Sequence, residues 1–412
     1  MPLTRRQKFR RRRLAFGGAA LAIIIVFAYG AISLGRSVPA AAATIDQTAT
    51  STISQPKTQV DWPSFGRGAL GAVGFDGLLS TTGDQTPFPI ASLTKTITSL
   101  VVLDKKPLAA GESGPNITLT SADVGYYYDT IAEDGSAAPV VAGSVFTQRQ
   151  MFEALLLPSA NNYSISLAVW AYGSVDAYLD AAKMWLAAHG LTGTTVTNTS
   201  GIGPTNKSTP ADLITIGKLV LANPALASIV SEKSAILPAI GEVDNTNALL
   251  GTHGVTGMKT GTDDESGACL LFSADIPVGG RTVTIVGVIL GADDHTVLDE
   301  AVVKLLASIP AGFHELQLTK AGTSFGTYSS EWGRSARILA GKDASAFVWQ
   351  DTPVTVKAQA RPLSAGSKGS TVGSVHYEIG AGAEGGATTV TVPLTLSADI
   401  APPTAWWKLT NP

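Results

Sequence analysis

The first 35 residues constrain the arrangement of this chain more strongly than any other segment does. Seven basic side chains lie within residues 1–13, and residues 14–35 carry no charge. A helix of that uncharged length extends about 33 Å, enough to cross the hydrocarbon core of a bilayer. Because basic residues stay on the cytoplasmic side, we expect residues 1–13 to form a cytoplasmic tip and the chain after residue 35 to lie outside.

Two interpretations of residues 14–35 remain open. A signal peptide has a shorter apolar core, and the four alanines at residues 40–43 offer small-residue cleavage sites. An uncleaved transmembrane anchor fits the length better. Both predict an extracytoplasmic protein, held to the cytoplasmic membrane through its N-terminal segment or secreted if that segment is cleaved.

The rest of the chain has the composition of an ordered globular protein with an acidic balance. Hydrophobic residues make up 45% and charged residues 15% of the sequence, which argues against disorder. With seven of the 29 basic residues in the tip, 22 remain against 32 acidic ones. Nucleic acid is therefore not an expected partner, because phosphate binding requires a basic face.

Cysteine and histidine give no sign of a metal site or a cofactor, and we predict neither. Cys269 is the only cysteine and lies in an apolar run, so we expect it to be buried and unable to form an intrachain disulfide. The five histidines form no ligand pair at helical spacing. We interpret His253 and His295 as surface or hydrogen-bonded residues.

Changes in composition and in the pattern of secondary-structure signals divide the chain into segments. Residues 36–58 are rich in Ala, Thr, Ser and Gln without a helical or strand period, and we interpret them as a linker. Helix and strand signals alternate over residues 59–312. In residues 313–412, short β-prone runs are separated by Gly, Ser and Pro turns, which predicts a small β-rich domain.

The first chemical motif is Ser92-Leu93-Thr94-Lys95. Apolar residues at 93, 97, 100 and 101 predict one face of a helix, which places Ser92 at the helix start and Lys95 one turn later on the same side. A lysine whose charge is disfavoured can take the proton of such a serine. An N-cap serine with a surface lysine gives the same pattern, so this motif alone is weak.

The second motif is Ser159-Ala160-Asn161. Thr147 and Gln150 indicate a capping box that starts a helix ending before Pro158, and a second helical run begins near residue 163. Ser159 and Asn161 therefore fall on a predicted loop, where a hydroxyl can relay a proton and an amide can hold a carbonyl. Serine and asparagine also favour ordinary turns.

The third motif is Lys259-Thr260-Gly261, at the end of a strand-like run. The next strand signals cover residues 268–274 and 281–290, and their short connections predict antiparallel neighbours. Lysine and threonine on an open sheet edge can meet a carboxylate, and glycine lets another backbone approach. A strand end with a turn glycine is the plainer interpretation.

In this order, the three motifs resemble those of the low-molecular-mass D-alanyl-D-alanine carboxypeptidases, a family of penicillin-binding serine peptidases. The resemblance covers roughly residues 64–310 and extends more loosely to residues 362–373. It implies an α/β (α+β) fold of the β-lactamase and transpeptidase type. In that fold an antiparallel sheet is covered by helices, with a helical subdomain, and a small all-β domain follows.

The resemblance also implies a reaction. Ser92 attacks the carbonyl between the last two D-alanines of a peptidoglycan stem peptide, Lys95 acts as base, and water hydrolyses the acyl-enzyme. Ser159, beside Asn161, assists proton transfer, and the terminal carboxylate meets Lys259 and Thr260. The remaining implied roles are an oxyanion hole formed by the N–H groups of Ser92 and Thr262, which follows Gly261, and acylation of Ser92 by β-lactams as covalent inhibitors.

Two features depart from the family pattern. Thr262 is followed by an acidic run at residues 263–265, and negative charge there should weaken binding of an anionic substrate. Residues 291–300 contain no arginine, although the family places one in this region to hold the substrate carboxylate. Arg281 is the candidate to replace it.

Other functions were compared with this one. A class A β-lactamase needs a glutamate after the second motif, and residues 154–231 contain none. A DD-endopeptidase that cuts cross-links by the same chemistry remains open. So does a penicillin-binding wall protein with a weakly active site.

Overall fold

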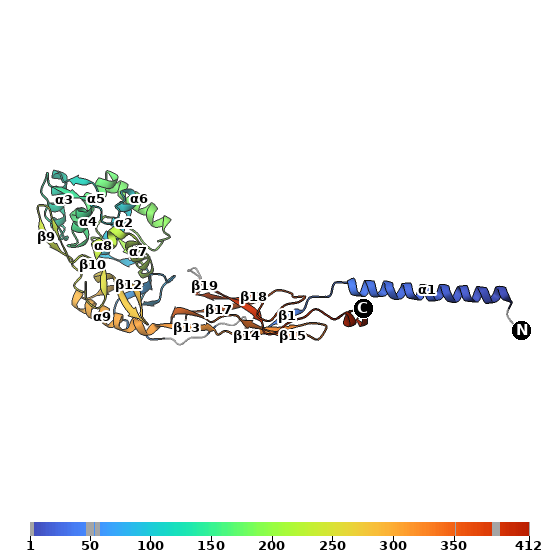
Figure 1. Cartoon of the computed structure of the whole chain (residues 1–412). Coiled ribbons are helices and arrows are strands. Elements are labelled where there is room, and N and C mark those ends of the chain that lie inside the picture. Colours follow the sequence, from blue (N-terminus) through green and yellow to red (C-terminus); the bar gives the residue numbers. More distant parts are fainter. Residues whose placement is uncertain (1–3, 47–52, 54–57, 351, 381–387, 412) are drawn as a thin grey trace. The chain divides into compact units, whose positions relative to one another are not determined.

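The computed structural model describes residues 4–46, 53, 58–350, 352–380 and 388–411. The chain forms two compact units, which Figure 1 shows in the colours of the sequence. One unit is Pro56–His314, and the other joins Met1–Gln55 to Glu315–Pro412. The junction after His314 lies two residues beyond the boundary predicted at residue 312.

A five-stranded sheet forms the frame of the Pro56–His314 unit. Its strands run in the order β10-β11-β12-β2-β3, and every pair of neighbours is antiparallel. β10 is therefore an edge strand. The five strands are β2 (Arg67–Ala72), β3 (Ser80–Thr82), β10 (Val255–Asp263), β11 (Gly267–Val278) and β12 (Arg281–Ala292).

Helices cover this sheet. α7 packs against β2, β11 and β12, α8 packs against β10, and α9 packs against β11 and β12. The view in Figure 1 has β10 and β12 between α7 and α8 on one side and α9 on the other. The helices are α2 (Thr94–Lys105), α3 (Ser121–Ala132), α4 (Gln148–Leu156), α5 (Asn161–Tyr172), α6 (Val175–Ala188), α7 (Pro210–Ala222), α8 (Pro224–Val230) and α9 (His295–Ser308), with the 3₁₀ turns η2 (Ala91–Leu93) and η3 (Ile309–Gly312).

Three small hairpin-like pairs connect the helices. The pairs are β4 (Phe88–Pro89) with β7 (Lys207–Ser208), β5 (Asn116–Thr118) with β6 (Val145–Thr147), and β8 (Ser234–Leu237) with β9 (Gly241–Asp244). The first pair matters for chemistry, because β4 leads directly into η2. Pairing Phe88 with Ser208 therefore fixes the direction in which the chain enters the Ser92 region.

The predicted apolar positions are buried, but α2 buries more than one face, because all of residues 94–103 are buried. Leu93, Ile97 and Val101 are nearly inaccessible and belong to the main hydrophobic core. Each fully buried aliphatic side chain of this kind contributes about 1.5–3 kcal/mol. The predicted capping box also forms, because Gln150 N donates to Thr147 Oγ1 and Thr147 N donates to Gln150 Oε1. Burial in the core therefore holds α2, and with it Lys95, in a fixed position.

The second unit contains a six-stranded antiparallel sheet in the order β1-β14-β15-β19-β18-β17 and a separate pair, β13 with β16. Its core is built on residues such as Tyr328, Tyr377 and Leu394. The strands are β1 (Ala42–Ile45), β13 (Phe313–Thr319), β14 (Ser324–Ser329), β15 (Ser335–Ala340), β16 (Ala344–Trp349), β17 (Val354–Ala360), β18 (Thr371–Ile379) and β19 (Thr388–Leu396).

The prediction of a linker over residues 36–58 is wrong for Ala42–Ile45. These residues form β1, an edge strand paired with β14, and the neighbouring Ala41 is buried in the same core. Small residues with little strand propensity are held here by pairing with a preformed edge, a tertiary effect that composition does not reveal. Residues 47–52 and 54–57 of the predicted linker lie outside the described residues.

The N-terminal segment forms α1 (Arg5–Gly35), which continues through the basic tip into the apolar run. Its most apolar window has a mean hydropathy of 2.2 and none of it is buried. Near its C-terminal end α1 meets α10 (Ala405–Thr410): Tyr29 Oη donates to the Leu409 carbonyl at 2.7 Å, and Lys408 Nζ donates to the Leu34 carbonyl at 3.2 Å. α1 is long and apolar enough to cross a membrane.

Candidate active site

Ser92 and Lys95 form the closest polar pair of the first motif. Ser92 lies in η2, Lys95 lies in the first turn of α2, and Lys95 Nζ is 2.7 Å from Ser92 Oγ. The same Nζ donates to the carbonyl of Ser200 at 3.1 Å. Because the Lys95 side chain is completely buried, a nucleophile and a candidate base are held in one fixed geometry.

Burial also changes the proton affinity of Lys95. Removal from water lowers its pKa well below the ordinary lysine value, and the charge of Lys259 lowers it further. A lysine whose pKa is lowered in this way loses its proton more readily than an exposed one. It can then accept the proton of the Ser92 hydroxyl.

The backbone around Ser92 is tightly constrained. Ala91 has φ +44°, a left-handed conformation that alanine rarely adopts. Gly201 lies against it, and a Cβ at Gly201 would sit 1.8 Å from the Ala91 carbonyl oxygen. Only glycine fits there, at φ +92°. This contact holds the Ser200 carbonyl where it meets Lys95.

The second motif connects α4 to α5. Ser159 and Asn161 are both buried, and Ser159 has φ +64°. Asn161 differs from its predicted loop position, because it is the first residue of α5. Its backbone N–H donates to the Ser136 carbonyl at 2.7 Å, which supplies a partner for an otherwise unpaired group at the helix start.

Ser159 is not directly bonded to the first motif. Among the described residues no hydrogen bond joins Ser159 Oγ to Ser92 or Lys95. α5 is hydrogen-bonded to α2 through Thr199, in addition to packing directly against it. Thr199 Oγ1 lies 2.7 Å from Ser164 Oγ, and the Thr199 carbonyl accepts from Thr98 of α2 at 2.7 Å.

The third motif lies on the edge strand β10. Lys259 is buried, and burial lowers its pKa to about 7. Its Nζ lies 3.5 Å from Thr260 Oγ1, which in turn lies 2.6 Å from Thr246 Oγ1. A Cβ at Gly261 would sit 3.1 Å from the Ser92 backbone nitrogen. The strand therefore runs directly beside Ser92.

Thr262 and the acidic run occupy the end of β10. Thr262 Oγ1 lies 2.6 Å from Nε2 of His295, the first residue of α9. Asp263 turns the chain into β11, with its carboxylate accepting from Ser266 N at 2.7 Å. Asp264 and Glu265 are exposed at the tip of this turn. The acidic run is thus partly a structural turn.

Arg281 cannot replace the missing arginine. It pairs with Val278 at one end of the β11–β12 hairpin, whereas Thr262 pairs with Ala268 at the other end of β11. Ten residues of extended strand separate these ends by about 33 Å. The residue that does reach Thr262 is His295, which the sequence analysis expected to be hydrogen-bonded but did not place at the site.

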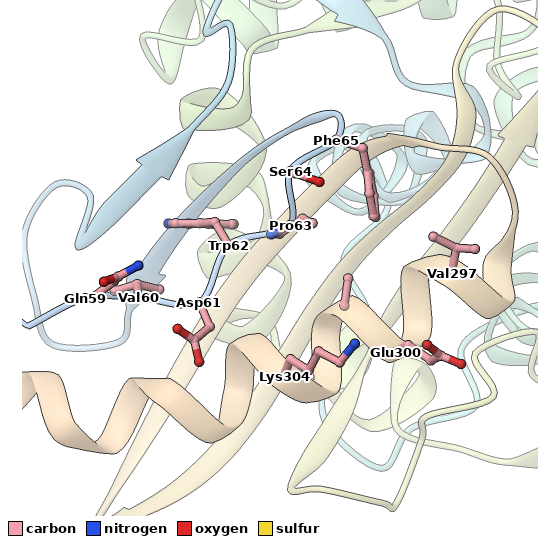
Figure 2. Close-up of a pocket in the computed structure, with 11 residues that line it drawn as sticks. Gln59, Val60, Asp61, Trp62, Pro63, Ser64, Phe65, Val297, Glu300 and Lys304 are labelled. Carbon is pink, nitrogen blue, oxygen red and sulfur yellow. The ribbon is translucent and has the colours of Figure 1, made fainter.

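A separate cavity of about 490 Å³ lies between residues 59–65 and α9 (Figure 2). Trp62, Phe65, Glu300 and Lys304 are among its lining residues, and it shares none with the Ser92 cluster. In the part of the chain that the structure describes, no three His, Cys, Asp or Glu side chains are grouped as metal ligands would be.

Comparisons with known proteins identify the family. The sequence model of the D-alanyl-D-alanine carboxypeptidases matches residues 77–294, more than half of the chain. The chain belongs to this family. It is therefore an enzyme of the serine DD-peptidase class. All three motifs fall within the matched residues.

Individual relatives agree with this assignment. A D-alanyl-D-alanine carboxypeptidase (DacB2) of Mycobacterium tuberculosis is 32% identical over 215 residues, covering 50% of this chain and 69% of that protein. A D-alanyl-D-alanine endopeptidase of Pseudomonas aeruginosa is 31% identical over 196 residues, covering 46% of this chain and 60% of that protein.

Solved structures confirm the predicted fold class. The crystal structure of the Streptomyces K15 DD-transpeptidase matches with a TM-score of 0.53 and 27% identity, covering 60% of this chain and 97% of that one. Penicillin-binding protein 5 of Haemophilus influenzae matches with a TM-score of 0.57 at 20% identity, covering 83% of this chain and 98% of that one. The second match reflects the fold alone, and its coverage reaches into the β-rich unit.

Proposed function

We propose that this enzyme removes the terminal D-alanine from peptidoglycan stem peptides through an acyl-enzyme on Ser92, and that β-lactams acylate the same residue. The observation that supports this most strongly is the 2.7 Å contact between Ser92 Oγ and the fully buried Lys95 Nζ. A serine is a weak nucleophile until a neighbouring base accepts its proton. Burial makes Lys95 that base.

The reaction proceeds in two steps. In the first, Lys95 takes the Ser92 proton, Oγ attacks the carbonyl carbon of the penultimate D-alanine, and the C–N bond breaks as the leaving amine receives a proton. In the second, water attacks the ester, its proton passes to the base, and the shortened peptide leaves. The N–H groups of Ser92 and Thr262 would stabilise the oxyanion in both steps.

The other motif residues have supporting roles in this proposal. Lys259 and Thr260 would meet the substrate carboxylate, because both face the site from β10 and their side chains are linked. Gly261 would let the substrate backbone approach Ser92. Ser159 would pass a proton toward the leaving amine, and Asn161 would hold a substrate carbonyl, both from the start of α5.

One alternative keeps the same chemistry. The match to a P. aeruginosa endopeptidase favours cleavage of cross-links as a second candidate activity. Asp264 and Glu265 at the tip of the β10–β11 turn add negative charge near the proposed carboxylate site. That charge would favour a substrate whose scissile bond is followed by fewer anionic groups.

We further propose that α1 stays attached as a membrane anchor. Cleavage within residues 40–43 would fall in or beside β1, where Ala41 is buried and hydrogen-bonded to Leu363. The contacts of Tyr29 and Leu34 with α10 would also be lost. α10 presents Trp406, 74% exposed, and tryptophan favours the membrane–water interface. An intact mass of the membrane-extracted protein that lacks residues 1–35 would refute this proposal.

The activity is tested with the full-length protein in detergent and its Ser92→Ala variant. Each is incubated with a fluorescent penicillin and with diacetyl-Lys-D-Ala-D-Ala, and both covalent label and released D-alanine are measured. The proposal expects label and release in the wild type and neither in the variant. Each protein is also incubated with cross-linked muropeptide dimers, and their cleavage to monomers without release of terminal D-alanine would instead establish the endopeptidase. Absence of label in the wild type would overturn the proposed acylation of Ser92.

A further inference from the structure

The contact between Thr262 and His295 joins two elements at the edge of the site. Thr262 is exposed and directly follows Gly261, where an added Cβ would sit 3.1 Å from the Ser92 backbone nitrogen. His295 is half-buried at the first position of α9, and its Nε2 lies 2.6 Å from Thr262 Oγ1. An imidazole and a hydroxyl are thus held side by side. Along β10 they lie one residue beyond Gly261, where the strand passes Ser92.

The positive groups already named on this side of the unit leave room for a second cationic partner of the substrate carboxylate. Lys259, which would meet that carboxylate from β10, is completely buried, and burial lowers its pKa to about 7, so it carries only part of a positive charge at neutral pH. Arg281 lies at the far end of the β11–β12 hairpin. Lys304 lies nine residues further along α9 than His295, about 13 Å away along the helix, and lines the separate cavity.

We propose that the imidazole of His295 and the Thr262 hydroxyl bind the terminal carboxylate of the substrate alongside Lys259 and Thr260, an inference that rests on the carboxypeptidase function proposed above. Protonated histidine donates from both ring nitrogens, so it can hold Thr262 and the carboxylate as a charged donor. His295 is then a specificity residue that contacts substrate. It takes no part in moving the proton of Ser92.

The charges around the imidazole make this recognition depend on pH. Burial lowers the pKa of His295, Asp299 and Asp294 act in the opposite direction, and Lys259 adds to the lowering. β11 and β12, which pack against α9, carry Asp275 and Arg281 toward their other ends. A bound carboxylate favours the imidazolium, so binding takes up a proton. Preference for a free carboxylate should therefore rise as the pH falls.

The test compares substrates that differ only in this group. The first pair is diacetyl-Lys-D-Ala-D-Ala with a free carboxylate or a C-terminal amide, and the readout is the ratio of kcat/KM for acid over amide. The second pair is a penicillin and its methyl ester, and the readout is the ratio of their rates of Ser92 acylation. Both ratios are measured in detergent between about pH 6 and about pH 9, on either side of the ordinary histidine pKa.

Four proteins are compared: the full-length wild type, His295→Asn, His295→Arg and the control His253→Asn. His253 precedes β10 at the opposite end of the strand from Thr262 and has φ +50°, which asparagine tolerates. Lys259 is common to all four, so its own titration cancels between them.

We expect His295→Asn to lower both acid preferences about tenfold to a hundredfold at about pH 6, the range for one hydrogen bond to a charged group. The loss should shrink toward about pH 9, where the wild-type imidazole is neutral. His295→Arg should retain the preference at both pH values, and His253→Asn should match the wild type.

Two results would overturn the inference. One is a His295→Asn protein that slows acid and amide substrates equally, which is the mark of a merely structural contact. The other is a His295→Arg protein that loses the acid preference as fully as His295→Asn does. Failure of the wild type to release D-alanine would count against the proposed function, while the penicillin pair would still decide the role of His295.

Discussion

The charge of Lys259 lowers the pKa of Lys95, although the two residues come from different elements, β10 and α2. Both side chains are buried and both face the region of Ser92. Burial is the larger cause of the lowered pKa of Lys95, and the second lysine adds to it. One buried lysine thus helps to lower the pKa of another.

Replacement of Lys95 by arginine should abolish acylation while keeping a positive charge at the site. Arginine is not deprotonated in proteins, so it cannot accept the Ser92 proton. We expect the rate of penicillin labelling to fall by about 10²–10⁴-fold, the usual contribution of a general base. Lys105→Arg, at the exposed end of α2, is the matched control. Labelling of Lys95→Arg at the wild-type rate would refute the role of Lys95 as base.

The influence of Lys259 on Lys95 can be measured as a pH shift. Because the Lys259 charge lowers the pKa of Lys95, Lys259→Met should raise it. Acylation requires neutral Lys95, so the rising limb of the rate against pH should move to higher pH in the variant. The measurement is the acylation rate by a neutral penicillin ester from about pH 5 to about pH 11, which brackets lowered and ordinary lysine pKa values. A limb that moves to lower pH would contradict the coupling.

Gly201→Ala should damage both stability and activity. The new Cβ would overlap the Ala91 carbonyl, 1.8 Å away, and φ +92° is unfavourable for alanine. We expect a loss of at least about 3 kcal/mol in the free energy of unfolding, the upper range for overpacking. Gly203→Ala is the control, because Gly203 has φ +77° but nothing within 4 Å of the new Cβ. Equal loss in the two variants, measured by denaturant unfolding, would show that the contact with Ala91 is unimportant.

The acidic turn should slow the reaction of anionic substrates. Asp264→Asn with Glu265→Gln removes two exposed charges near the end of β10. We expect kcat/KM for the free-acid peptide to rise about two- to fivefold at low salt, the scale of exposed charge interactions. The gain should disappear at high salt, where such interactions are screened. Asp263 is left intact, because it caps the turn by accepting from Ser266. A gain that persists in high salt would point to a change of structure.

Local periodicity predicted the first motif well. The apolar spacing around Ser92 is a property of one helix, and α2 forms there, although it buries its polar positions as well as the predicted apolar ones. Strand order was also accessible, because β10, β11 and β12 follow one another with short turns. These are features that neighbouring residues determine among themselves.

Features that depend on distant segments were missed. Thr262 and His295 are 33 residues apart in sequence, and they meet only because α9 folds back over the strand end that β10 reaches. Ala42–Ile45 becomes a strand only because the edge of β14, far along the chain, is open to it. Neither pairing leaves a periodic signal in the local sequence.

Location of the acyl group is the most direct test of the central claim. The full-length protein is treated with penicillin, digested with trypsin and analysed by tandem mass spectrometry, with fragmentation of the peptide that ends at Lys95. The Ser92–Lys95 geometry predicts a single adduct whose fragment masses place it on Ser92. An adduct on any other residue, or an unmodified peptide after full exposure to the drug, would contradict the assignment of Ser92 as the nucleophile.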